Sequence, residues 1–116
     1  MTEESNEGRN SSFKTVHLSD NEILLLVTGA MTGDRVGLFE RSIRILCKST
    51  YSTITLDLSH VDEISSLFVG HILECHKQLT AEKRKIRIRG CNESVAEVLV
   101  LMHIDKTIEI ERAIDF

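Results

Sequence analysis

The feature of this sequence that most constrains its fold is a repeated order of short strand-like and longer helix-like segments. Residues 54–58 and residues 85–89 alternate between apolar and polar side chains, as β-strands with one buried face do. Between them, residues 66–82 place apolar side chains at helical spacing. This order favours two parallel strands joined by a right-handed crossover helix.

The same patterns extend along the chain and predict an α/β fold in the order β-β-α-β-α-β-α-β. The predicted elements are strands 13–18 and 22–28, a helix around 36–47, strand 54–58, helix 66–82, strand 85–89, a turn at 90–92, helix 93–102 and strand 107–110. Thr32 or Asp34 is expected to cap the first helix. We expect a single mixed sheet whose inner strands are parallel. Helices should lie mainly on one face, because the alternating strands are not apolar throughout.

Length and composition indicate one small domain. The chain has 116 residues, of which 41% are hydrophobic, so it has the length and the apolar content of one globular domain. Residues 1–12 are polar and are expected to form a disordered tail before a domain at residues 13–116. The longest apolar run, residues 23–27, is far shorter than the roughly 20 residues of a membrane span. With no signal-like segment at the start, the expected location is the cytoplasm.

The three cysteines predict a reducing compartment. Cys47, Cys75 and Cys91 are odd in number and show no CxxC spacing. We therefore expect them to be small apolar core residues rather than parts of a disulfide framework.

The predicted topology places two distant loops together. If strands 22–28 and 54–58 are parallel, the loops that follow them, 29–34 and 59–66, leave from the same edge of the sheet. Ligands and partners of open α/β sheets usually bind at this carboxyl edge.

Three segments resemble the STAS domain family, which is shared by anti-sigma-factor antagonists and the cytosolic parts of sulfate transporters. They are Leu-Val-Thr-Gly at 26–29, Ile-Thr-Leu-Asp-Leu-Ser-His-Val-Asp-Glu-Ile-Ser-Ser at 54–66, and the stretch 95–105. The resemblance covers residues 13–112 and extends to the order of the strands. It implies a bacterial, non-enzymatic module that regulates transcription through protein–protein contacts.

The resemblance also implies a phosphorylation site. The family motif after the third strand is Asp-Ser-(Ser/Ala)-Gly, and its serine or threonine is phosphorylated by a partner kinase. In this chain the aligned residues are Ser65, Ser66, Leu67 and Phe68, so Ser66 occupies the acceptor position and Ser65 replaces the acidic residue. Thr32 stands where many members carry an acidic residue before the first helix.

The start of a helix is also a favourable place for a phosphate on physical grounds. Backbone N–H groups in the first turn lack partners and the helix dipole favours negative charge. Ser66 is thus the predicted phosphoacceptor, and Ser65 is the alternative. The alternative interpretation is that both serines have a structural role alone and begin the helix, with Ser65 as its N-cap.

The predicted partner-binding residues lie in these two loops and the following helix turn: Gly29, Met31, Thr32, Asp62, Ser65, Ser66 and Leu67. Leu67 falls off the apolar stripe of its helix. It is either a binding anchor for a partner or packed beneath the loop 59–64.

Two functions fit this reading. The first is a switch that captures an anti-sigma serine kinase and is released by phosphorylation of Ser66. The second is a constitutive, non-phosphorylated STAS subunit of a transport complex or signalling scaffold, which the loss of the acidic residue at Ser65 favours.

Other signals in the sequence are weak. The basic stretch 82–89 carries five basic residues and one acidic residue in a chain of net charge −4, and fits either an acidic partner or a solvated strand face. Its lack of aromatics and the acidic chain argue against nucleic-acid binding.

Metal-binding and catalytic signals are also weak. His71 and Cys75 are spaced i, i+4, but two residues are too few ligands for a zinc site. His60 lies near Ser65 in sequence, but nothing orients it as a base. We therefore predict no catalytic residue, metal or cofactor.

Overall fold

The computed structural model describes residues 12–113 of the chain. The expected tail therefore lies outside the described residues, apart from Ser12. Ser12 is buried, and its carbonyl oxygen accepts a hydrogen bond from Thr28 N at 2.8 Å.

The elements follow the predicted order. They are β1 (Phe13–His17), β2 (Glu22–Thr28), α2 (Asp34–Cys47), β3 (Thr53–His60), α3 (Ser66–Ala81), β4 (Lys85–Cys91), α4 (Glu93–Leu101), the short 3-10 helix η1 (Ile104–Lys106) and β5 (Glu109–Arg112). The strands form one sheet in the order β1-β2-β3-β4-β5, in which β1 is antiparallel to β2 and the other neighbours are parallel. The predicted mixed α/β sheet is confirmed.

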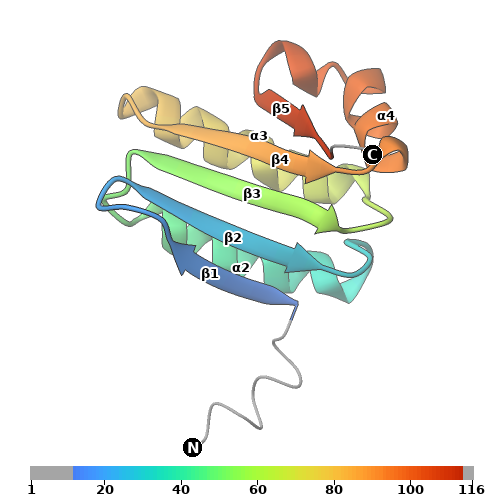
Figure 1. Cartoon of the computed structure of the whole chain (residues 1–116), viewed down its shortest axis with the longest axis horizontal. Helices are drawn as coiled ribbons and strands as arrows, with labels where there is room; N and C mark the ends of the chain where they lie inside the picture. The colour runs from blue at the N-terminus through green and yellow to red at the C-terminus, as the bar shows by residue number, and fades with distance from the viewer. Residues whose placement is uncertain (1–11, 114–116) are drawn as a thin grey trace, which may run out of the picture.

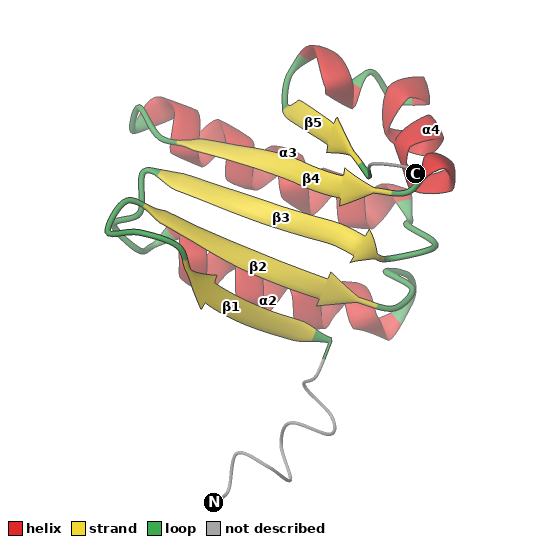
Figure 2. Ribbon diagram, viewed as in Figure 1, coloured by secondary structure: helices red, strands yellow, loops and turns green. Residues whose placement is uncertain are grey.

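Two long helices cover one face of this sheet. α2 and α3 lie side by side behind the strands, and α4 lies beside the end of β4 and β5 (Figures 1 and 2). Alternate residues of the inner strands point toward α2 and α3 and are buried: Ile23, Leu25, Val27, Ile54, Leu56, Leu58, Ile86 and Ile88. The rings of Phe39 on α2 and Phe68 on α3 pack with their centroids 4.5 Å apart. The core is thus mainly aliphatic and lies between the sheet and the helices that cover one of its faces.

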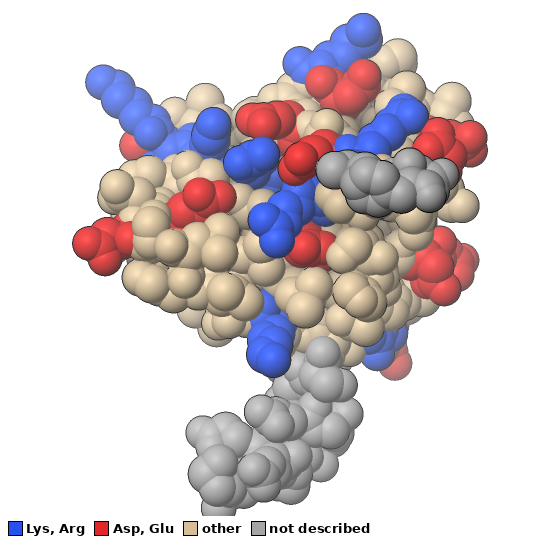
Figure 3. Space-filling model, viewed as in Figure 1, with Lys and Arg blue, Asp and Glu red and all other residues tan. Residues whose placement is uncertain are grey.

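The opposite face carries the basic residues of β4. In register across the strands, Asp57 pairs with Arg89, and Arg87 pairs with Glu109. Arg89 Nε lies 3.2 Å from Asp57 Oδ2, and Arg87 Nη2 lies 3.2 Å from Glu109 Oε2. Figure 3 shows that basic and acidic side chains lie beside one another on this face. Acidic groups of the chain itself therefore pair with β4, which favours the solvated strand face over an acidic partner.

The start of α2 differs from the prediction. Neither Thr32 nor Asp34 caps the helix, because the N-cap is Gly33, at φ 59°. This left-handed backbone suits glycine, which lacks the Cβ that makes it costly for other residues.

The last strand begins two residues later than predicted. His103 adopts a left-handed conformation (φ 62°), and η1 follows it before the chain extends. The expected turn at 90–92 is also wrong in part. Gly90 and Cys91 belong to β4, whose register with β5 shifts between Arg89 and Cys91.

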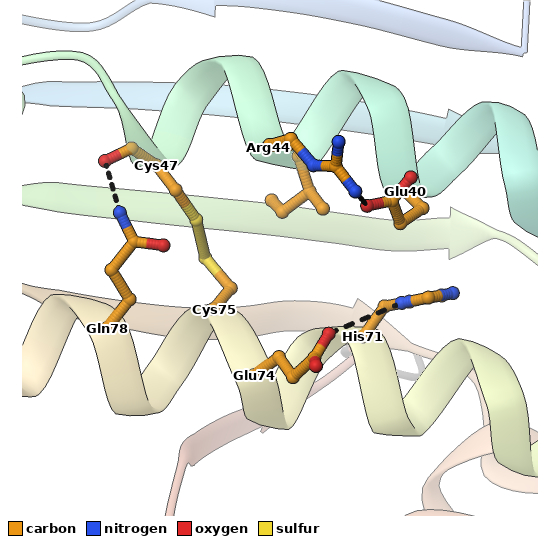
Figure 4. Close-up of a pocket in the computed structure, with 8 residues that line it drawn as sticks. Glu40, Arg44, Cys47, His71, Glu74, Cys75 and Gln78 are labelled. Carbon is orange, nitrogen blue, oxygen red and sulfur yellow. Dashed lines mark hydrogen bonds and ion pairs between the residues drawn. A yellow bond between two sulfur atoms is a disulfide. The ribbon is translucent and has the colours of Figure 1, made fainter.

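The prediction for the cysteines is wrong for two of the three. Cys47, the last residue of α2, forms a disulfide with Cys75 in the middle of α3, and their Cα atoms are 6.4 Å apart. Figure 4 shows this bond in a groove between the two helices. Both cysteines are buried, as expected, but the packing of α2 on α3 brings together residues 28 apart in sequence. Cys91 is a buried free cysteine.

Candidate protein-binding site

The two loops predicted to be neighbours are joined by main-chain hydrogen bonds. Met31 and Ile64 form a parallel bridge beyond the ends of β2 and β3. Met31 N donates to Glu63 O at 2.8 Å, and Ser65 N donates to Met31 O at 3.1 Å. The predicted neighbourhood of loops 29–34 and 59–66 is confirmed. These bonds hold the segment before α3 against the end of β2.

A glycine turn holds the first loop close to the first turn of α2. Gly29 has φ 99°, and its N–H donates to His60 O at 2.9 Å. The Arg35 guanidinium donates to Ala30 O at 3.0 Å and to Thr28 O at 2.7 Å. A Cβ at position 29 would lie 2.6 Å from Arg35 Nη2, so a side chain there would displace this guanidinium, and the backbone angle itself favours glycine.

The start of α3 presents two side chains to solvent. Ser65 is the N-cap, and its Oγ accepts a hydrogen bond from Phe68 N at 3.2 Å. Ser66 is the first residue of the helix and is exposed. Leu67 is also exposed, at 60%, whereas Phe68 is fully buried in the core. The loop 59–64 therefore does not cover Leu67. The Phe68 side chain lies in the core and does not contribute to the surface.

The remaining predicted residues divide by exposure. Asp62 is exposed, and Gly29 and Thr32 are half-buried. Met31 is fully buried. Its side chain belongs to the core and offers no surface to a partner, so its contribution to the site is the backbone bridge.

Sequence reasoning missed two side chains that support these loops, Arg35 and Asn92. Asn92 caps α4 and also donates from Nδ2 to Val61 O at 2.8 Å. An N-cap position before Glu93 is readable from the sequence, but a contact with residue 61 is not.

A polar cluster lies at the end of β3, close to the same edge. Ser59 Oγ donates to Asp57 Oδ1 at 2.5 Å, and His60 Nδ1 lies 3.2 Å from Ser59 Oγ. Burial acts to raise the pKa of Asp57, but hydrogen bonds from Ser59 and the Arg89 guanidinium outweigh it and lower the pKa below its ordinary value. The Asp57 carboxylate thus accepts a direct hydrogen bond from the Ser59 hydroxyl. A nucleophilic serine instead donates to an oriented histidine, which takes its proton, so the arrangement around Ser59 differs from that of a catalytic serine.

Two kinds of feature are absent from the described part of the chain. Residues 12–113 contain no group of three or more metal-ligating side chains placed to hold an ion. Within the same residues, no helix combines the length and apolarity needed to cross a bilayer.

The fold and site together define a class of protein. It is a small mixed-sheet α/β domain in which two loops meet at the carboxyl edge of the parallel strands, where a helix begins with exposed Ser66 and Leu67. The model of the STAS domain family matches residues 14–116, which is most of the chain. The chain therefore belongs to the STAS domain family. A comparison with curated protein sequences found no significant match.

Solved structures with this fold include anti-sigma factor antagonists. An antagonist from Mycobacterium paratuberculosis is 17% identical, with a TM-score of 0.76 over 86% of each chain. The antagonist SpoIIAA in its unphosphorylated form is 14% identical, with a TM-score of 0.73 over 84% of this chain and 86% of that one. The phosphorylated Bacillus SpoIIAA is 13% identical, with a TM-score of 0.67 over 84% of this chain and 89% of that one. At these identities the likeness establishes the fold.

Proposed function

We propose that this chain is a regulatory STAS domain that binds an anti-sigma serine kinase, and that phosphorylation of Ser66 ends this binding. The binding surface consists of the loop 59–66, the first turn of α3 and the adjoining residues 29–32. Capture of the kinase would free the sigma factor that the kinase otherwise holds. The observation that carries the proposal is the exposed Ser66 at the start of α3, next to exposed Leu67 and on a segment bonded to Met31.

The chemistry of this position suits a phosphate switch. In the transfer, Ser66 Oγ attacks the γ-phosphorus of ATP on the kinase, ADP leaves, and a base of the kinase takes the hydroxyl proton. The product carries a charge of about −1.5 to −2 where the free hydroxyl was neutral. Unpaired N–H groups of the first helix turn stabilise that charge within the free domain. The same charge makes a closely packed, desolvated contact with the partner unfavourable.

Support also comes from the relatives and from the role of Ser65. SpoIIAA, which shares this fold, has been solved in unphosphorylated and phosphorylated forms. Ser65 Oγ accepts a hydrogen bond from Phe68 N as the helix cap, whereas Ser66 is exposed. Ser66 is therefore the better acceptor of the two.

The proposal is tested by binding of the purified chain to the anti-sigma serine kinases of its source organism. We expect Ser66→Ala to bind one of them as the wild type does and Ser66→Asp to bind at least about tenfold more weakly, as measured by calorimetry. Mass spectrometry after incubation with that kinase and ATP should place one phosphate on Ser66. Ser94 offers a matched control, because it is exposed in the first turn of α4. Ser94→Asp adds the same charge at another helix start and should leave binding unchanged.

The second candidate is a constitutive STAS subunit of a transport complex or scaffold. Ser65 in place of the acidic residue of the family motif favours it. If Ser66→Asp and Ser66→Ala bind the partner equally well and no phosphate is found, this second function replaces the switch.

A further inference from the structure

The turn between β4 and α4 packs against the loop that leads to Ser66. A Cβ added at Gly90, which has φ 74°, would lie 3.2 Å from Ser59 Cβ and 3.3 Å from Asp57 Oδ1. Two residues later, the Asn92 side chain reaches Val61. The end of β4 therefore contacts the segment 59–61 through a close approach at Gly90 and a hydrogen bond from Asn92.

The amide of Asn92 has both of its ends engaged. Oδ1 accepts from Val95 N at 2.9 Å, which caps α4, and Nδ2 donates to Val61 O at 2.8 Å. The two contacts require opposite ends of the amide, because one faces an N–H and the other a carbonyl. Asn92 is itself only partly exposed, so this bond competes little with water.

Val61 is the point from which the rest of the loop extends. Its side chain is fully buried, and its N–H bonds to Leu58 O at 3.0 Å. Asp62 and Glu63, which follow it, are exposed, and the next main-chain anchors of the loop are the bonds with Met31. The hydrogen bond from Asn92 to Val61 O therefore holds one end of the exposed residues 62–63, and the Met31 bridge holds the other end.

We infer that Asn92 is a positioning residue, which holds the loop 61–65 in the conformation that presents Ser66 and Leu67 to a partner. This role rests on the proposed function, because only a binding surface gives the position of the loop a functional meaning. It adds the β4–α4 turn to the elements on which the site depends.

One substitution separates the two contacts of Asn92. Asn92→Asp keeps an oxygen for Val95 N, and Asp is as good an N-cap as Asn. It loses the donor to Val61 O and places a carboxylate oxygen near that carbonyl. Asn92→Ala, the comparison variant, loses both contacts.

The test is amide hydrogen exchange of the free 116-residue chain at pH 7, measured by NMR. In Asn92→Asp we expect the amides of Met31 and Ser65 to exchange about tenfold faster than in the wild type, since a partly buried hydrogen bond that fastens the loop is lost. The amide of Val95 should stay within about twofold of its wild-type rate. In Asn92→Ala, all three amides should exchange faster.

Two results would overturn the positioning role. The first is wild-type exchange at Met31 and Ser65 in Asn92→Asp. The second is an equal acceleration at Leu56 in the core of β3, which would mean that Asn92 only stabilises the fold. No partner is present in this measurement, so its outcome is independent of whether Ser66 is a switch. Equal binding of the two Ser66 variants would remove the proposed function alone, and unchanged exchange would remove the positioning role alone.

Discussion

Reduction of the Cys47–Cys75 disulfide should destabilise the domain by an amount that follows from the length of chain it closes. The two cysteines are 28 residues apart, and the bond joins the end of α2 to the middle of α3. For a closed loop of this length, the loss of denatured-state entropy is about 12 cal/mol/K, which stabilises the fold by about 3.5 kcal/mol at 25 °C. Since small domains have about 5–15 kcal/mol of total stability, reduction should remove a large share of it.

The assay is urea denaturation followed by far-UV circular dichroism, with and without a phosphine reductant. The wild type should lose about 3.5 kcal/mol of unfolding free energy in the reductant. The double variant Cys47→Ala, Cys75→Ala should show the same curve in both conditions. Cys91→Ala is the matched control, and its stability should remain sensitive to reductant, because Cys91 takes no part in the bond.

A thiol count makes the result unambiguous. The unreduced chain should show one alkylatable thiol when denatured, that of Cys91. In the folded chain this thiol should react slowly, because burial raises its pKa and keeps it neutral. Three thiols in the denatured, unreduced chain, or identical urea midpoints with and without reductant, would refute the reasoning.

The remaining predictions concern a carboxylate and an exposed leucine. Asp57→Asn should lower stability at pH 7. Because the pKa of Asp57 is lowered in the folded state, its contribution is present above its unfolded pKa of about 3.9 and is lost as the pH falls through the folded value, so wild type and variant should converge in acid. Urea titrations of both proteins from pH 7 to pH 2 check this, and a gap that stays constant would contradict it. If the proposed kinase is the partner, Leu67→Ser should weaken its binding by about tenfold with little change in stability, since the side chain is 60% exposed. Ile45→Ser, at a 70% exposed position near the far end of α2, is the control and should bind as the wild type does.

Much of the fold was predictable because the hydrophobic pattern and the order of segments dictate it. The strand Glu22–Thr28 was placed at its observed bounds, since a run of aliphatic residues between turn residues has few alternatives. The meeting of the loops 29–34 and 59–66 followed from parallel pairing alone. The exposure of Leu67 agrees with helical periodicity, which predicts it to lie away from the buried stripe.

The features that the sequence does not predict depend on how the helices and strands pack against one another. The Cys47–Cys75 bond requires two helices to face each other at one point, and no local spacing encodes that. The burial of Met31 is not predictable from the sequence, because a glycine-rich loop gives no inward or outward pattern. The sequence predicts Asn92 in a turn, but its second hydrogen bond depends on the packing of β4 against the end of β3.

The main-chain bridge between Met31 and Ile64 has a consequence for how such a surface can diverge during evolution. Its hydrogen bonds join backbone atoms, so they survive the exchange of the side chains around them. An insertion or deletion in either loop would instead shift the paired atoms out of register. Descendants of this domain should therefore acquire new partners by replacing exposed residues such as Asp62 and Leu67, while the lengths of both loops stay constant.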